Sequence, residues 1–471
     1  MSDDTFLASK ADWIKAQKRR APQLKDAPAL CRNLEEALDL RRVEHSMFTC
    51  STPTWKLGTS YDFSSNDTLS LARSGEIRRA FLDELDRHPD FLMHSGGSRI
   101  MDGNYPYIEQ VEAEIAAFHG AETALIVGSG YEANMAIFAA VPRPGDAIVY
   151  DELVHASTLE GMAACPVQCR VQFRHNDADA LREAMASVLD TQPQIVDGSR
   201  SLFITVESVY SMDGDVCPLL EMLEVAGEMC PKGNAVFIMD EAHATGNMGP
   251  KGAGLVSQLG VEKQIAIRLH TCGKALASTG AAILSNVSVR NAILNFARCV
   301  IFTTAPAFPM VAGMRAAYQL MRDGKTQPYQ DKVQELIKYF LQCTESDPYW
   351  SKAAEQGILV LPNYDDCAPR DFNAPIVSLK SRPRYIWWLA FQLHLSNISA
   401  IPVDYPAVPR GQGRIRFMFH AANTEEQVEF LVKKIGEWAA EMMEIEAGPS
   451  GGKGKIPKAA QHVYALMSSQ G

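Results

Sequence analysis

The sequence of 471 residues lacks paired cysteines, long apolar runs and an excess of positive charge. Its ten cysteines are scattered without a C-x-x-C pair or the spacing of a zinc site, which favours reduced thiols and no metal. No apolar run approaches the roughly 18 residues of a membrane span, and the first residues lack the pattern of a signal peptide. A net charge of −11 argues against nucleic acid or an anionic membrane as the main partner. We therefore expect a cytoplasmic protein that binds neither nucleic acid nor membrane.

The length is too great for one compact core and indicates a large domain plus a smaller one. Apolar runs that read as strands alternate with helical patterns, which predicts an α/β fold with a mostly parallel sheet. We expect four parts in chain order: an N-terminal arm (1–60), a large domain (61–329), a smaller C-terminal α/β domain (330–446) and a flexible tail (447–471) that begins with a glycine-rich stretch.

The segment from residue 236 to 286 carries the strongest signal for chemistry. Its apolar run ends in Asp240, as a buried parallel strand would where open α/β sheets bind ligands, and His243 follows three residues later. Lys274 lies between a Thr-Cys-Gly turn and a run of small residues, a setting that would lower its pKa and suit a Schiff base. Each feature alone is more often structural. Together they indicate pyridoxal phosphate, whose ring nitrogen pairs with the acid and whose aldehyde is held by the lysine.

The motifs D-E-A-H-A-T-G at 240–246 and T-C-G-K-A at 271–275 resemble those of the α-oxoamine synthase family of fold-type-I pyridoxal-phosphate enzymes. The chain looks most like the 8-amino-7-oxononanoate synthase-like members. Further matches lie in order at 65–71, 95–99, 128–134, 151–157, 207–215 and 414–416. The resemblance covers roughly residues 55–445 and implies pyridoxal 5'-phosphate as the cofactor. It implies a decarboxylating condensation of an amino acid with an acyl-CoA, or another acyl thioester, to give an α-oxoamine.

The resemblance assigns catalytic roles to four residues. Lys274 would hold the cofactor and remove the α-proton, and Asp240 would keep the ring nitrogen protonated. His155 would stack on the ring, and His243 would hydrogen-bond the ring hydroxyl or the acyl carbonyl. The other cofactor-binding residues that it implies are Ser129, Gly130, Tyr131, Ser211, Thr271, Thr303 and Thr304.

Three residues are implied for substrate binding. Asn66 and Arg416 would hold the amino-acid carboxylate, for which a guanidinium fork is well shaped. Arg41, in the N-terminal arm, would meet the acyl substrate, although a solvated arginine at a helix end is at least as plausible from the sequence. Thr303 and Thr304 resemble a segment that reaches the partner's active site, so we expect a homodimer.

Four positions depart from the family pattern. Thr68 and Ser70 replace a tyrosine and a glycine, His94 stands where glycine is common, and Pro402 lies about where some members carry a second substrate arginine. These changes leave open which amino acid and which acyl thioester are used. The sequence is compatible with a role in biotin synthesis and with one in secondary metabolism.

Three other functions compete with the synthase. Asp240 and Lys274 alone also fit an aminotransferase on the same fold. A non-catalytic partner subunit, like those that assist serine palmitoyltransferase, is disfavoured because Lys274, Asp240 and His243 are intact. The sequence Asp-Glu-Ala-His at 240–243 also matches the DEAH motif of helicases, which need a phosphate-binding loop upstream of it. The Gly-Lys-Thr at 324–326 lies downstream and lacks the first glycine of such a loop, which disfavours a helicase.

Overall fold

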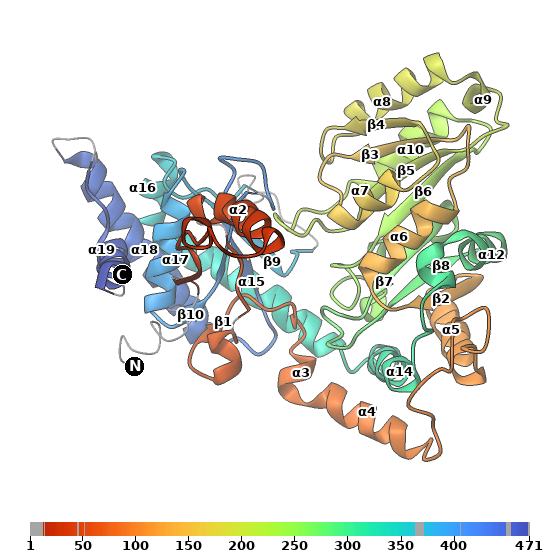
Figure 1. Cartoon of the computed structure of the whole chain (residues 1–471), viewed down its shortest axis with the longest axis horizontal. Helices are drawn as coiled ribbons and strands as arrows, with labels where there is room; N and C mark the ends of the chain where they lie inside the picture. Colours follow the sequence, from red (N-terminus) through yellow and green to blue (C-terminus); the bar gives the residue numbers. More distant parts are fainter. Residues whose placement is uncertain are drawn as a thin grey trace.

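The computed structural model describes residues 13, 15–44, 47–50, 52–362, 372–405, 407–448 and 454–469. Figure 1 shows two lobes, a larger one built on a central sheet and a smaller one that contains the C-terminal helices. The helix α15 (Gln327–Ser346) runs from the large lobe into the small one. The predicted α/β fold class is confirmed.

The large domain is built on a seven-stranded sheet in the order β2-β8-β7-β6-β5-β3-β4. All strands run parallel except β8, which is antiparallel to both neighbours. The strands are β2 (Thr123–Val127), β3 (Ala147–Asp151), β4 (Cys169–Phe173), β5 (Leu202–Glu207), β6 (Ala235–Asp240), β7 (Ile265–Thr271) and β8 (Ala281–Ser285).

Helices cover both faces of this sheet, which explains why its central strands are apolar on both sides. In β6, Ile238 packs into a cluster with α6 (Gly130–Ala140) and α12 (Val287–Phe296). Its neighbour Phe237 points the other way, toward α8 (Ala178–Thr191) and α10 (Leu219–Met229). The remaining helices of this domain are α3 (Leu71–Ser74), α4 (Glu76–Asp86), α5 (Pro106–Phe118), α7 (Ala156–Ala163), α9 (Pro193–Val196), α11 (Leu255–Leu259), α13 (Arg298–Ile301) and α14 (Phe308–Arg322).

The small domain packs helices against a three-stranded antiparallel sheet in the order β11-β12-β9. Its core includes Phe417 of β12 and Trp438 of α18, both fully buried. A two-stranded parallel pair, β1–β10, joins the start of the large domain to this lobe. The elements are β1 (Tyr61–Asp62), β9 (Ile376–Lys380), β10 (Ile398–Ser399), β11 (Ile401–Val403), β12 (Arg414–Met418), α16 (Trp350–Glu355), α17 (Tyr385–Leu395) and α18 (Glu425–Ala447).

The tail does not follow the prediction over its second half. Residues 447–471 were expected to be flexible, whereas α19 (Lys458–Ser469) packs against α17. Trp388 donates a hydrogen bond through Nε1 to Tyr464 Oη at 3.1 Å, and Ala460 and Val463 are buried. The short apolar stretch that follows the glycine-rich linker in the sequence forms this helix and supplies its apolar face.

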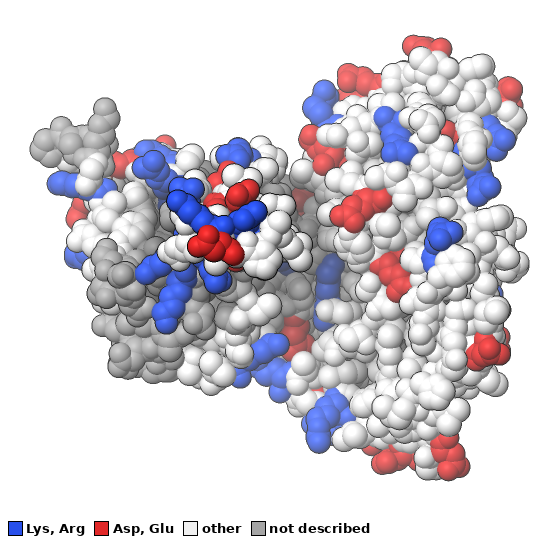
Figure 2. Space-filling view, viewed as in Figure 1, with Lys and Arg blue, Asp and Glu red and all other residues white. Residues whose placement is uncertain are grey.

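The N-terminal arm carries α2 (Ala29–Val43), preceded by a short turn of helix at Ala21–Gln23. The Trp13 ring stacks on Trp387 of α17, with ring centroids 6.3 Å apart. Figure 2 shows Lys and Arg side chains mixed with Asp and Glu over the face that carries α2. No helix in the described ranges is long and apolar enough to cross a membrane.

Candidate active site

Polar side chains end four neighbouring strands at one edge of the large sheet. β6 ends with Asp240, and β5 ends with Glu207, which pairs with Asp240 in register. On either side, β3 ends with Asp151 and β7 ends with Thr271. The carboxyl ends of parallel strands meet at one edge, where open α/β sheets bind ligands. This edge is where the sequence predicted Asp240 to lie.

A chain of hydrogen bonds links Asp240 to His155. Asp240 Oδ1 accepts from the backbone N–H of Ala242, and Oδ2 accepts from Asn134 Nδ2, both at 2.9 Å. Asn134, which is 2% exposed, also donates to Ser157 Oγ at 2.9 Å. Ser157 Oγ lies 2.7 Å from His155 Nδ1. The buried amide of Asn134 therefore fixes the orientation of the acid and of the histidine together.

His155 presents an uncharged ring to the cleft. It is the N-cap of α7, and its backbone N–H donates to the Glu207 carboxylate. The surrounding protein desolvates the ring and lowers its pKa; the charge of Asp240 opposes this shift and that of Lys274 adds to it. The Tyr131 ring stands edge-on to it, with centroids 6.3 Å apart. A neutral, exposed imidazole suits stacking on an aromatic ring.

Lys274 lies in a tight loop between β7 and β8. The backbone of Cys272 brackets this loop, donating to Gly280 O and accepting from Ser278 N, each at 2.9 Å. Ala277 N donates to Lys274 O at 2.9 Å, and Ala277 adopts φ of 48°, in the left-handed region. The loop thus holds the lysine at the carboxyl edge of the sheet.

The same placement makes the Lys274 amine easier to deprotonate. Burial lowers its pKa, whereas the charges of Asp240 and Glu207 oppose this shift. The nearby Arg416 guanidinium lowers the pKa further. A lysine of this kind is suited to act as a nucleophile and as a base.

His243 is buried in the turn after β6 and stays neutral. Burial lowers its pKa well below the ordinary value, and the charges of Lys274 and Arg416 act in the same direction. The turn is held by Asn247, whose Nδ2 donates to His243 O at 3.0 Å and whose Oδ1 accepts from Thr68 Oγ1 at 2.7 Å. The unusual threonine at position 68 therefore supports the His243 turn from within the core.

Glu241, the second acid of the DEAH letters, is structural. Its two carboxylate oxygens accept the backbone N–H groups of Leu255 and Val256, each at 2.9 Å, at the start of α11. Gly254 makes this close approach possible, because a Cβ there would lie 1.6 Å from Glu241 Oε2. The side chain is fully buried, and burial raises its pKa to about 7. It points into the core rather than into the cleft.

The start of α6 lies against the end of β7 and forms a cradle for an anion. A Cβ on Gly130 would lie 3.5 Å from Thr271 Cβ and 3.6 Å from Thr271 Oγ1. Ser129 is the N-cap, and its Oγ accepts from Glu132 N at 3.1 Å. The helix N-terminus directs its free N–H groups and its positive dipole end toward this place. These residues could hold the phosphate of pyridoxal phosphate, and Lys274 and Asp240 lie where they could meet its aldehyde and ring nitrogen.

Arg416 and Asn66 meet, although 350 residues separate them in the chain. Arg416 Nη2 donates to Asn66 Oδ1 at 3.0 Å and contacts Met418 Sδ at 3.1 Å. Its Nε is buried and has no hydrogen-bond partner among the described residues. Burial lowers the pKa of Arg416 to about 10. A half-buried guanidinium with an unused donor could bind a carboxylate.

The remaining predicted residues lie in three other places. Ser211 is half-buried in the turn that follows β5. Thr303 and Thr304 are exposed after α13, beside the 95–99 loop, where Ala305 N donates to Gly97 O at 2.9 Å. Arg41 is exposed on α2, with its guanidinium 5.6 Å from the centre of the Phe48 ring. The roles assigned to these residues stay predictions.

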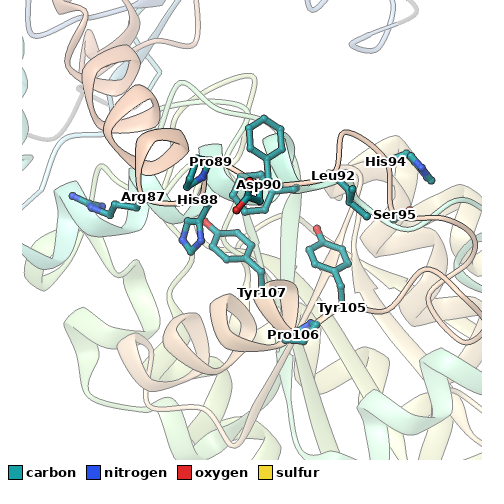
Figure 3. Close-up of a pocket in the computed structure, with 12 residues that line it drawn as sticks. Arg87, His88, Pro89, Asp90, Leu92, His94, Ser95, Tyr105, Pro106 and Tyr107 are labelled. Atoms are coloured by element: carbon teal, nitrogen blue, oxygen red, sulfur yellow. The ribbon is translucent and has the colours of Figure 1, made fainter.

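A cavity of about 530 Å³ lies outside the cleft that holds Asp240 and Lys274 (Figure 3). Aromatic side chains form much of its wall; the rings of Phe91 and Phe308 stack with centroids 4.7 Å apart, and Tyr107 lies against Phe308. Tyr105 Oη donates to Pro306 O at 2.8 Å, so the cavity adjoins the Thr303–Thr304 segment. None of the predicted site residues lines it, and we do not regard it as the reaction centre.

Sequence reasoning missed two residues that organise the site. Glu207 supports His155 and lies beside Asp240; burial, followed by the Asp240 charge, raises its pKa well above the ordinary value. Asn134 holds Asp240. Both lie within motifs that pointed to the family, at 207–215 and 128–134. Their partners, however, come from other elements, and only the fold reveals them.

Known proteins resemble the chain at the level of family, sequence and fold. Residues 60–435 match the family model of class I and II aminotransferases. An aminoacyl transferase sphA from Aspergillus fumigatus is 59% identical and covers 97% of each chain. An 8-amino-7-oxononanoate synthase from Emericella nidulans is 42% identical over 83% of this chain and 92% of its own. A serine palmitoyltransferase structure from Sphingomonas wittichii has a TM-score of 0.67 at 22% identity, covers 81% of this chain and 87% of its own, and shows a shared fold.

Proposed function

Since the chain belongs to the α-oxoamine synthase family of pyridoxal-phosphate enzymes, we propose that it condenses an amino acid with an acyl thioester and releases carbon dioxide. The observation that carries this proposal is the grouping of three side chains at the cleft. Asp240 can hold a ring nitrogen, the desolvated Lys274 can act as a base, and Arg416 has an unused donor for a carboxylate.

When bound, pyridoxal phosphate supplies an electron sink for a carbanion at the amino-acid α-carbon. Asp240, which Asn134 keeps in place, would pair with the ring nitrogen. The α6 N-terminus and Thr271 would bind the phosphate, and the His155 ring would lie against the pyridine.

Lys274 would move the α-proton, and His243 would stabilise the charge that develops on the acyl oxygen. Because burial lowers the pKa of Lys274, its Nζ is available as a free amine to take the α-proton. Arg416, supported by Asn66, holds the carboxylate that is later lost. The neutral imidazole of His243 can donate a hydrogen bond to the acyl oxygen as negative charge develops there.

For the acyl group, we favour a substrate outside biotin synthesis. The aminoacyl transferase relative is 59% identical over nearly the whole chain, whereas the 8-amino-7-oxononanoate synthase is 42% identical over a shorter span. Ser65 and Ile401 line a groove of about 410 Å³. Ser65 precedes Asn66 in the chain and Ile401 pairs with Arg416 in the sheet, so the groove lies beside the proposed substrate site. Pro402 lines this groove about where some family members carry a second substrate arginine, and Lys56 is the lysine in its lining.

We also propose that the enzyme is a homodimer. Large apolar side chains are exposed on the large domain near the Thr303–Thr304 segment, and Met93 and Phe302 are 70% and 72% exposed. A second copy would cover this surface and would bring Thr303 and Thr304 to its partner's site.

The test is free-thiol release by the pyridoxal-phosphate-loaded protein with pairs of amino acids and acyl-CoA thioesters. We expect thiol only with a matched pair, and none from Lys274→Ala. Keto-acid formation from an amino donor without thiol would instead indicate an aminotransferase. Failure to bind the cofactor would indicate a non-catalytic subunit.

A further inference from the structure

A histidine outside the cleft is held between two carboxylates. His175 follows β4, and its Nδ1 lies 2.9 Å from Asp151 Oδ1 at the end of β3. Its Nε2 bonds to the carboxylate of Asp215. Because carboxylates only accept, both ring nitrogens must carry protons. Burial alone would lower the pKa of His175, but the two carboxylates outweigh it and raise the pKa to about 10.

The neighbouring Asn176 binds the same two carboxylates, those of Asp151 and Asp215. Its backbone N–H donates to Asp151 Oδ2 at 2.8 Å, and its Nδ2 donates to Asp215 Oδ2 at 2.7 Å. Asn176 adopts φ of 50°, a left-handed conformation that asparagine tolerates. The Tyr210 ring packs edge-on against the His175 ring, with centroids 4.4 Å apart. His175 and Asn176 together therefore join the β3 end to the segment that contains Asp215.

That segment, residues 208–217, is a hairpin that reaches the small domain. A bridge between Val209 and Val216 closes its base. Near its tip, the Asp213 carboxylate binds Arg414 of β12 and accepts from Ser378 Oγ of β9 at 2.7 Å. The next residue, Gly214, packs so closely on β9 that a Cβ would lie 2.2 Å from Ile376 O.

We infer that His175 is a positioning residue for substrate binding, because it fixes the hairpin whose Asp213 holds the strand that carries Arg416. Arg414 and Arg416 lie on the same face of β12, two residues apart. One continuous set of contacts runs from Asp151 through His175 and Asp215 to the hairpin, and from the hairpin to β12. The large domain thus positions Arg416, the proposed carboxylate-binding arginine, through these contacts. The inference rests on the proposed role of Arg416 in binding the amino-acid carboxylate.

The test compares amino-acid binding by holoenzyme variants. His175→Gln is neutral and cannot donate from two ring nitrogens, so the hairpin loses one of its anchors. Absorbance titration of the bound pyridoxal phosphate with glycine, L-alanine and L-serine gives a Kd that does not depend on turnover. We expect about a tenfold weaker Kd for the amino acid that the unmodified enzyme binds, with cofactor affinity unchanged.

A double-mutant cycle separates positioning from general loosening. Asp213→Asn should weaken amino-acid binding in the same way, and the double variant should bind no worse than the weaker single variant, because both changes break one path. Arg174→Gln, which removes a positive charge from the adjacent residue, should bind normally. Should His175→Gln fail to fold, Asp215→Asn replaces it in the cycle.

The outcomes separate the two proposals. If the unmodified holoenzyme shows no response to any amino acid, the proposed function fails. If it responds, and either His175→Gln binds equally well or its effect adds fully to that of Asp213→Asn, the inference about His175 is overturned.

Discussion

Replacing the guanidinium of Arg416 should weaken amino-acid binding sharply without destabilising the protein. Burial lowers its pKa to about 10, a shift that corresponds to roughly 3 kcal/mol of unfavourable burial. Arg416→Met keeps the apolar stem, removes that cost and loses the bond to Asn66, which contributes about 1 kcal/mol. The free energy of unfolding of the ligand-free variant should therefore stay level or rise by about 1–2 kcal/mol.

Binding should change in the opposite direction. A carboxylate held by the guanidinium fork gains two charge-assisted hydrogen bonds of about 1.5–3 kcal/mol each, so their loss predicts a Kd that is about 10²–10⁴-fold weaker. Arg416→Lys keeps the charge but lacks the guanidinium fork, so its Kd for the amino acid should lie between those of the original protein and Arg416→Met.

Two measurements on the same variants check this prediction. Urea unfolding gives the stability, and absorbance titration of the holoenzyme with the amino acid gives the Kd. An Arg416→Met variant that binds the amino acid as tightly as the original would refute carboxylate binding by Arg416. A loss of stability by several kcal/mol would refute the account of an uncompensated buried charge.

Three further predictions concern the cofactor, the pH dependence of stability and the dimer. Asn134→Ala removes the 2.9 Å bond to Asp240 and should weaken pyridoxal-phosphate binding about 10–100-fold, measured by absorbance titration; unchanged affinity would remove its supporting role. Glu241 has a pKa of about 7 in the folded protein and an ordinary pKa of 4.5 in the unfolded chain, so the unfolded state loses its proton first as pH rises. The free energy of unfolding should therefore fall by roughly 3 kcal/mol between pH 4.5 and about pH 7. Urea unfolding of Glu241→Gln should lack that fall, and parallel pH profiles for the two proteins would contradict it. Met93→Asp places a charge on the exposed apolar surface and should shift a dimer toward monomer in sedimentation velocity, whereas an unchanged dimer would place the interface elsewhere.

The sequence predicted the strand that ends in Asp240 from an apolar run that stops at an acid. β3, β5 and β6 end at Asp151, Glu207 and Asp240 because buried parallel strands require continuous apolar residues and their ends do not. The strands on either side of Lys274 were not predicted. β8 consists largely of small and aliphatic residues and pairs antiparallel with β2 and β7, an arrangement that no local pattern specifies.

The sequence by itself determined the family to which the chain belongs and predicted the chemistry at Asp240 and Lys274, because the motifs around these residues are contiguous. The resemblance already assigned Arg416 and Asn66 to one carboxylate, and the tertiary structure added the direct hydrogen bond between them across 350 residues. Only the tertiary structure decided that Asn134 holds Asp240. It also placed His175 between two carboxylates from other segments. Hydrogen bonds of this kind depend on the distance and direction between side chains from separate elements, which are set by how the sheet and its helices pack and not by the order of residues along the chain.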